Sequence, residues 1–437
     1  MRSALPKVLQ SLGGQALLDH VLAQARSVSP ERIVVVYGHG GDDVRAVFPD
    51  TDLRWAHQAE QRGTGHALAQ ALPELGAAGP VLVLCGDVPL IETATLSELL
   101  VAAGDGVALL TVQMPDPSGY GRIVRDGSGA VSRIVEHRDA SDVELEIDEV
   151  NAGIMVLPGA QLARWLGALS DDNAQGELYL TDLIAAAIAD GVAVTAVIAG
   201  TAEEVMGVND RVQLAEAEAE LQRRRVLTLL EDGVTVMDPL RLDVRGSVRA
   251  GRDVVLDINV VLEGEVVLGD DVTIGPGCVI RDCVIGDGTQ VAAHSVLDDA
   301  RIGSGCRIGP FARIRPGTEL GAGVRIGNFV ETKSSSFADG SKANHLSYIG
   351  DAQIGAGANV GAGTVTCNYD GVRKHRTVIG DGAFIGSGTM LVAPVTVGER
   401  ATIGAGSVIT KDAPADELSM SRAKQTVVPG WERPTKD

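Results

Sequence analysis

The spacing of hydrophobic residues differs between the two halves of this chain. From about residue 1 to 211, short apolar runs rich in β-branched residues alternate with helix-like stretches. The runs are Ile33 to Tyr37, Val81 to Cys85 and Val107 to Val112, and Leu17 to Arg26 is one of the helix-like stretches. This alternation predicts an α/β domain over 1–211 with a mostly parallel sheet.

Residues 212–231 lie between the α/β pattern and the pattern of the second half. This stretch is rich in Glu, Ala, Leu and Arg, contains no Gly or Pro, and is followed by Asp232 and Gly233. The pattern predicts a helix that stops at a glycine. We therefore expect a linker helix over 212–232 and a second domain over 233–437.

A six-residue period dominates the second domain. An aliphatic residue opens each hexad, at Leu268, Ile274, Ile280, Ile285, Val291, Leu297, Ile302, Ile308, Ile314, Leu320, Ile326, Ile354, Val360, Ile379, Ile385, Leu391, Val397, Ile403 and Ile409. A small residue usually follows four positions later, as at Cys278, Thr289, Ser295, Cys306, Ala312, Thr318, Ala358, Thr364, Ala383, Thr389, Ala401 and Ser407. This pattern predicts a parallel β-helix of hexapeptide repeats, with the aliphatic and the small residue pointing inward.

The period is interrupted twice, over 332–348 and over 366–377. We expect both segments to loop out of the solenoid, where insertions in repeat proteins concentrate function. Two shorter steps, 280 to 285 and 297 to 302, indicate tightened turns.

Composition agrees with this architecture and excludes several functions. The chain has 54 Gly and only 3% aromatic residues, as a narrow core of small side chains requires. Its net charge of −21 argues against general nucleic-acid binding. The sequence has no apolar run long enough for a membrane span and no secretory signal, so we expect a cytoplasmic protein. The five Cys form no C-x-x-C pair, which favours reduced thiols over a disulfide or zinc framework.

Cationic and titratable residues gather in the two interruptions. The first contains Lys333, Lys342, His345 and Tyr348, and the second contains a run from Arg373 to Arg376. In an acidic chain such a cluster suits a phosphorylated substrate, and a histidine there can accept a proton near neutral pH. The alternative is that these charges only solvate loop tips.

The first domain has polar segments where a nucleotide site needs them. They are Leu5 to Leu9, Gln58 to Gly65, Cys85 to Leu90 and Gly119 to Arg122. Asp87 follows an apolar strand, at the edge where open α/β sheets bind ligands, and could hold Mg²⁺ against phosphates. The alternative for a Gly-Asp pair after a strand is a simple turn.

Three motifs carry a resemblance to a known family. They are Asn-Phe-Val-Glu-Thr-Lys at 328–333, Ala-Asn-His-Leu-Ser-Tyr at 343–348 and Gly-Ala-Gly-Thr-Val-Thr-Cys-Asn-Tyr-Asp-Gly at 361–371. From Met1 to about Arg433 the chain resembles the bacterial bifunctional N-acetylglucosamine-1-phosphate uridyltransferase/glucosamine-1-phosphate acetyltransferase. The resemblance implies a nucleotidyltransferase (Rossmann-like) domain and a left-handed β-helix, a homotrimer that binds acetyl-CoA between subunits, and cell-wall precursor synthesis from UTP with Mg²⁺.

The resemblance also assigns residues to the two sites. In the acetyltransferase, His345 corresponds to the general base, and glucosamine-1-phosphate contacts fall on Arg315, Lys333, Tyr348, Asn359 and Lys374. Acetyl-CoA contacts fall on Ala362, Asn368, Tyr369, Ser387, Ala405 and Arg422. In the uridyltransferase, nucleotide-sugar contacts fall on Lys7, Gln58, Gly63, Thr64, Cys85, Gly86, Asp87, Gly121, Glu136, Asn151 and Asn209, and Asp87 and Asn209 correspond to the Mg²⁺ ligands.

The chain departs from the family pattern at its start. The family has a strand and a Gly-rich loop immediately before the Leu-Pro-Lys segment, and here Met1 stands where that loop ends. Because the loop cradles the triphosphate, we expect slower uridyl transfer than in a form extended upstream. Three interpretations follow: a bifunctional enzyme, an acetyltransferase alone, or a noncatalytic scaffold that joins the same two folds. His345 and its cationic neighbours argue against the scaffold.

Overall fold

The computed structural model describes residues 1–38, 40–76 and 79–436. Internal contacts divide the chain into two compact units, Met1–Leu221 and Gln222–Asp437.

The first unit contains a mixed β-sheet and two separate strand pairs. One pair is parallel and joins β3 (Ile33–Tyr37) to β4 (Leu53–His57), and the other is antiparallel and joins β1 (Ser11–Leu12) to β2 (Gln15–Ala16). The larger sheet has the order β10-β6-β9-β7-β8, with β5 also on β9. Its strands are β5 (Pro80–Val83), β6 (Val107–Gln113), β7 (Arg122–Arg125), β8 (Val131–Val135), β9 (Glu149–Pro158) and β10 (Val194–Ile198).

The expected mostly parallel sheet is wrong for this unit. In the larger sheet only β6 and β10 pair in parallel among the described strands, whereas β9 runs antiparallel to β5, β6 and β7. An apolar run predicts a strand but carries no local signal for its direction, which depends on how distant segments meet.

Helices cover both faces of the larger sheet. The core on one face contains residues of α4 (Thr93–Ala103), and the core on the other contains residues of α3 (Thr64–Ala71), α6 (Gly159–Gly167) and α7 (Asp182–Ala189). The helices α1 (Leu17–Ser27) and α2 (Gly41–Val47) instead pack with β3 and β4, and α5 (Asp142–Leu145) is a short helix without buried residues. Successive residues of β6 enter different cores: Leu109 packs with Trp165 of α6, whereas Leu110 packs with Leu96 of α4. This alternation makes a helix-sheet-helix sandwich and confirms the α/β prediction.

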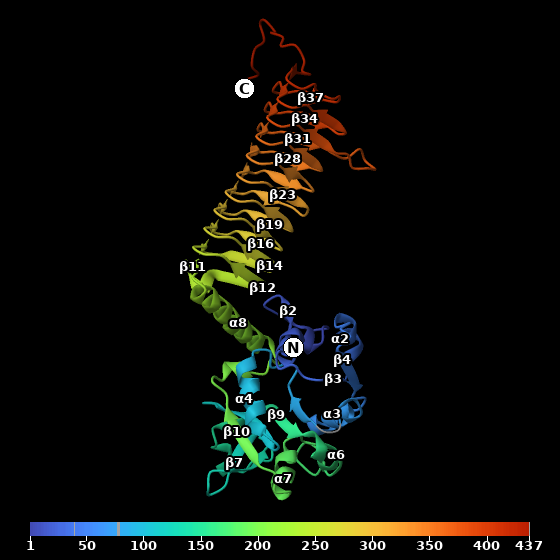
Figure 1. Ribbon diagram of the computed structural model, residues 1–437, viewed down its shortest axis with the longest axis vertical. Coiled ribbons are helices and arrows are strands. Elements are labelled where there is room, and N and C mark those ends of the chain that lie inside the picture. Colours follow the sequence, from blue (N-terminus) through green and yellow to red (C-terminus); the bar gives the residue numbers. More distant parts are fainter. Residues whose placement is uncertain (39, 77–78, 437) are drawn as a thin grey trace. The chain divides into compact units, whose positions relative to one another are not determined.

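The second unit is a stack of short parallel strands (Figure 1). It begins with β11 (Thr235–Val236) and β12 (Leu242–Ala250) and ends with β38 (Leu418–Ser419). Each strand pairs in parallel with the strand one coil later, as β12 does with β14 (Val260–Leu268). The predicted inward aliphatic residues are buried in one continuous core, and the small residues four positions after them are buried as well. The β-helix prediction is therefore confirmed.

The predicted loop over 332–348 is wrong, because this segment continues the β-helix. Its strands are β25 (Glu331–Lys333), β26 (Ser336–Phe337), β27 (Lys342–His345) and β28 (Tyr348–Gly350), each paired with neighbouring coils. The inward positions are taken by Thr332, Phe337 and Ala343, all buried. The hexad pattern was defined by Leu, Ile or Val at the inward position. Because this segment has Thr, Phe and Ala there, the six-residue period seems interrupted although the coils continue.

The second predicted insertion does leave the stack. After β31 (Val365–Cys367) the chain forms a small hairpin closed by a bridge between Tyr369 and Lys374, and it returns to the coil at β32 (Thr377–Ile379). Figure 1 shows this segment projecting from the side of the β-helix next to β31.

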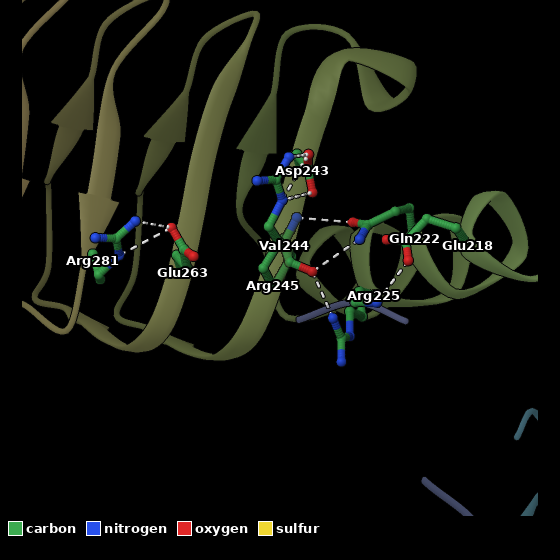
Figure 2. Close-up of polar contacts among 9 residues, drawn as sticks. Glu218, Gln222, Arg225, Asp243, Val244, Arg245, Glu263 and Arg281 are labelled. Carbon is green, nitrogen blue, oxygen red and sulfur yellow. Dashed lines mark hydrogen bonds and ion pairs between the residues drawn. The ribbon is translucent and has the colours of Figure 1, made fainter. Parts of the chain in front are cut away.

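The helix α8 (Arg211–Glu231) closes the first coil of the β-helix. The Gln222 side chain accepts a hydrogen bond from the Val244 N–H at 2.8 Å and donates one to the Val244 carbonyl at 2.9 Å. Arg225 donates to the same carbonyl at 2.6 Å (Figure 2). Val226 and Leu229 of this helix belong to the β-helix core. The helix therefore satisfies backbone groups of β12 that would otherwise form an open sheet edge.

Candidate functional sites

The cations predicted for the acetyltransferase site meet on the β-helix. Arg315 and Lys333 occupy equivalent positions on adjacent coils, since the Arg315 N–H donates to the Thr332 carbonyl at 2.9 Å. The nearby Lys374 ammonium and Arg315 guanidinium hold the pKa of Lys333 below its usual range, with Lys374 acting most strongly. Arg315 also forms an ion pair with Glu331, its Nη1 2.6 Å from Oε1, so one carboxylate lies beside the three cations. An anion placed there would relieve the remaining repulsion between Lys333 and Lys374.

The hairpin that carries Lys374 is tied to the same coils. The Asn368 amide donates to Asp351 Oδ2 at 2.5 Å and to the Tyr348 hydroxyl at 3.4 Å. Within the hairpin, Asp370 accepts the backbone N–H groups of Val372 and Arg373 and pairs with His375 Nε2 at 2.7 Å. These bonds hold the pKa of Asp370 well below its usual range, so the hairpin has a stable anionic centre.

His345 ends β27 and is exposed to solvent. It stands in register with Asn328 of β24 (Arg325–Asn328), one coil earlier, and its Nδ1 lies 2.8 Å from Asn328 Oδ1. The following residue, Leu346, turns the corner with a positive φ, and β28 then begins with Tyr348. His345 and Tyr348 therefore flank one corner of the prism.

Three of the predicted acetyl-CoA residues lie in one column. The Gly388 N–H donates to the Ala362 carbonyl at 2.7 Å, and the Gly406 N–H donates to the Ser387 carbonyl at 2.8 Å. Ala362, Ser387 and Ala405 thus occupy equivalent turns of successive coils. Arg422 reaches the same column, because its Nη1 donates to the Ala405 carbonyl at 3.0 Å.

Asn359 lies on a neighbouring part of the β-helix. It belongs to β30 (Asn359–Val360) and is in register with Lys342, at the start of the strand that ends in His345. Asn368 and Tyr369 belong to the projecting hairpin. The predicted acetyltransferase residues therefore spread over several coils, from Arg315, just after β22 (Arg313–Ile314), to Arg422, after β38, and onto the hairpin beside β31.

The first unit brings Lys7, Asp87 and Asn209 together. The Lys7 ammonium, in the 3₁₀ turn η1 (Lys7–Leu9), donates to Asp87 Oδ2 at 2.5 Å and to Asn209 Oδ1 at 2.9 Å. The Val208 N–H donates to the Asp87 carbonyl at 2.8 Å, which fixes the two segments side by side. Gly86 packs near Val8, so Cys85 to Asp87 lies against the segment that carries Lys7.

A second group surrounds Gly121. The Asn151 N–H donates to the Gly121 carbonyl at 2.8 Å, and the Glu136 carboxylate lies close to Gly121. Burial raises the pKa of Glu136, while Thr181 donates to its Oε1 at 2.8 Å. Cys85 joins this group to Asp87, since its thiol donates to the Gly153 carbonyl at 3.4 Å.

A third group follows β4. Gln58 Nε2 donates to the Gly63 carbonyl at 3.1 Å, and the Thr64 hydroxyl accepts the Leu180 N–H at 3.1 Å. Gly63 has a φ of 105°, and a side chain there would collide with Glu177 and Leu178. Only glycine fits this position without strain. The negative charge of Glu177 also raises the pKa of Glu136, so the third group lies near the second.

Two polar residues of these sites, Arg122 and Asn328, belong to motifs named from the sequence, but the sequence assigned them no role. Arg122 is 2% exposed and donates from Nη1 to the carbonyls of Pro117 and Tyr120, which holds the loop before Gly121 in place. Asn328 was seen only as part of a motif. Nothing in either residue's type marks such a role, and the spacing between Asn328 and His345 gains meaning only once the coil length is known.

The residues predicted for Mg²⁺ fit a divalent cation. Asp87 supplies a carboxylate oxygen and Asn209 an amide oxygen, the ligands that hard cations prefer, and phosphates and water would complete the shell. Both oxygens already contact one positive charge, the Lys7 ammonium. Among the described residues, no group of three or more His, Cys, Asp or Glu side chains forms a metal site independent of substrate.

Two further features lie outside this chemistry. Burial raises the pKa of the Cys85 thiol to about 12, which disfavours a thiolate nucleophile there. A surface hollow of about 470 Å³, bordered by Arg45, Phe48 and Trp55, contains none of the predicted site residues.

Family models match both units. A MobA-like NTP transferase domain matches residues 1–142, a GMPPB C-terminal domain matches 244–328, and six bacterial transferase hexapeptide repeats match 376–411. Fold and sites thus define a nucleotidyltransferase joined to a hexapeptide-repeat transferase.

Relatives that match over nearly the whole chain identify one family within this class. The bifunctional protein GlmU of Aromatoleum aromaticum is 57% identical over 437 residues, covering 100% of this chain and 96% of the relative. Those of Alkalilimnicola ehrlichii and Chromobacterium violaceum are 56% and 55% identical, covering 99% and 100% of this chain and 94% and 96% of the relatives. The chain belongs to the bifunctional GlmU family, which confirms the predicted family.

Proposed function

We propose that this chain makes UDP-N-acetylglucosamine for cell-wall synthesis in two steps at the sites described above. The β-helix transfers acetyl from acetyl-CoA to glucosamine-1-phosphate, and the α/β unit then transfers uridylyl from UTP to N-acetylglucosamine-1-phosphate. Because the bifunctional relatives match along nearly their whole length, the acetyltransferase-only and scaffold alternatives are not favoured. The site assignment rests on three neighbouring cations: Arg315 and Lys333 occupy equivalent positions on adjacent coils, and Lys374 of the hairpin lies close to Lys333.

In the acetyl-transfer step, the three cations bind the sugar phosphate and orient the amine toward His345. His345 Nε2 removes a proton from the attacking amine as its nitrogen bonds to the thioester carbonyl carbon. The carbon–sulfur bond then breaks, and the coenzyme A thiolate takes the proton back from the imidazolium. The Ala362, Ser387 and Ala405 column, with Arg422, holds the coenzyme beside this corner.

In the uridyl-transfer step, Asp87 and Asn209 would hold Mg²⁺, which would neutralise phosphate charge. The Lys7 ammonium moves from these two oxygens to a phosphate when substrate binds. Gln58, Gly63 and Thr64 hold the uracil, whereas Gly121, Glu136 and Asn151 hold the sugar. The sugar phosphate oxygen attacks the α-phosphorus of UTP, and pyrophosphate leaves.

We also propose that the active form is a cytoplasmic homotrimer. An exposed column of apolar residues runs along one corner of the β-helix and ends beside His345. His294 stacks on Phe311 at 5.2 Å, and Phe311 stacks on Phe329 at 5.4 Å, with Leu346 next in the column. Phe311, Phe329 and Leu346 are about half exposed, as suits a surface that a second subunit covers. Among the described residues no helix is long and apolar enough to cross a membrane.

The phosphate assignment is tested by binding of glucosamine-1-phosphate, measured by calorimetry on the full chain. Losing one charge-assisted contact typically costs 1.5–3 kcal/mol. We therefore expect Lys333→Met and Lys374→Met each to weaken binding by about tenfold or more. Lys411→Met, which removes an exposed lysine on another coil, is the matched control and should bind within twofold of wild type. Unchanged affinity in both site variants would refute the assignment.

A further inference from the structure

The contact between His345 and Asn328 decides which nitrogen of the imidazole can act as a base. Asn328 Oδ1 lies 2.8 Å from His345 Nδ1. A carbonyl oxygen has only lone pairs, so the proton in this hydrogen bond must sit on Nδ1. In the neutral ring the other nitrogen, Nε2, then carries the lone pair.

We propose that Asn328 is a positioning residue that holds His345 in the Nδ1–H tautomer, so that Nε2 takes the proton from the substrate amine. This inference rests on the proposed role of His345 as the general base. It adds a residue that acts through His345 without touching the substrate, and a reason why that residue must offer an acceptor.

The backbone around this pair is fixed on both coils. The Leu346 N–H donates to the Asn328 carbonyl at 3.1 Å, and the Gly363 N–H donates to the His345 carbonyl at 3.2 Å. The coils approach so closely beside the pair that a Cβ on Gly327 would stand 2.0 Å from the Asn344 carbonyl oxygen. Asn328 is also partly buried, whereas His345 is exposed. The less mobile partner therefore orients the more mobile one.

Two substitutions distinguish the effect of the hydrogen-bond acceptor on Asn328 from the effect of its side-chain shape. Asn328→Leu keeps the size and branching of asparagine but removes the acceptor. Asn328→Asp keeps an oxygen in the same position. If Asn328 acts through the tautomer, the aspartate variant should restore what the leucine variant loses, whereas a purely structural role would give no such rescue.

The test combines imidazole ¹⁵N spectroscopy with steady-state acetyl transfer on the full chain. Histidines are labelled with ¹⁵N, and the His345 signals are assigned from their loss in His345→Gln. We expect the Nδ1–H tautomer in wild type and in Asn328→Asp, and a population shifted toward Nε2–H in Asn328→Leu. We also expect kcat to fall about tenfold in Asn328→Leu, a part of the usual general-base effect, with KM for both substrates within twofold.

Two results would overturn the inference. One is an Nε2–H tautomer in wild type, which would mean that the asparagine amide group donates to Nδ1. The other is an unchanged tautomer in Asn328→Leu. Failure of the proposed function looks different, because His345→Ala would then retain acetyl transfer whatever tautomer the ring adopts.

Discussion

At the scale of single residues, the chemistry of a site depends on which oxygen and nitrogen atoms can still bind a ligand. In the proposed uridyltransferase site the Lys7 ammonium contacts both oxygens expected to bind Mg²⁺. A metal ion and this ammonium cannot occupy the same position, since like charges repel strongly at such distances. Lys7 must therefore leave Asp87 and Asn209 when metal and nucleotide arrive.

This exchange predicts opposite effects of Lys7→Ala on two ligands. Without nucleotide, Mg²⁺ should bind Lys7→Ala several-fold more tightly than wild type, because no ammonium competes for Asp87. Binding of UDP-N-acetylglucosamine should weaken, because a phosphate contact is lost. Calorimetric titration of each ligand checks both effects, and weaker Mg²⁺ binding in Lys7→Ala would contradict the exchange.

The site assignments stay predictions, and residue types pointed to the candidate side chains but not to the partners that hold them. The cationic cluster and His345 stand out because charges of one sign gather in an acidic chain. The role of Asn328 does not stand out, because it depends on a register between coils that no local pattern contains. The buried Arg122 is likewise a polar residue whose place only the folded loop reveals.

At the scale of elements, the hexad rule predicted most coils of the β-helix because inward aliphatic and small residues alternate at fixed spacing. It failed where Thr332, Phe337 and Ala343 take the inward positions, since the rule looked for aliphatic residues alone. In the first unit, strands were predicted from apolar runs, but their direction was not. A buried strand needs apolar residues whether its neighbour is parallel or antiparallel, so an apolar run does not reveal the strand direction.

The close stacking of coils predicts that one added methyl group disturbs the acetyltransferase site. In Gly327→Ala the new Cβ would stand 2.0 Å from the Asn344 carbonyl oxygen, so the backbone must shift beside His345. We expect the β-helix to lose about 1–3 kcal/mol of stability, as overpacking does, and acetyl transfer to fall.

Calorimetric unfolding and acetyl transfer measure these two effects. Gly127→Ala is the control, because no atom lies within 4 Å of its added Cβ, and it should change neither value appreciably. A Gly327→Ala protein with wild-type stability and activity would show that the coils can move apart freely.

At the scale of the whole molecule, the apolar column on the β-helix predicts assembly. Wild type should have the mass of three 45.3 kDa chains, whereas Phe329→Asp should place a charge in the subunit contact and give single chains. Analytical ultracentrifugation at one protein concentration measures both masses. Val101→Asp changes an exposed apolar residue of α4 and should leave the mass unchanged. A trimeric Phe329→Asp protein would exclude this column as the subunit contact.

The central claim is that two separate sites on one chain catalyse two successive reactions. The most direct test measures both half-reactions, each from its own substrates, in wild type, His345→Ala and Asp87→Ala. Wild type should perform both. His345→Ala should lose acetyl transfer by roughly 10²- to 10⁴-fold and keep uridyl transfer, because His345 is the proposed general base and is exposed, outside the core. Asp87→Ala should show the reverse. Wild-type acetyl transfer in His345→Ala, or loss of both reactions in either variant, would contradict the account.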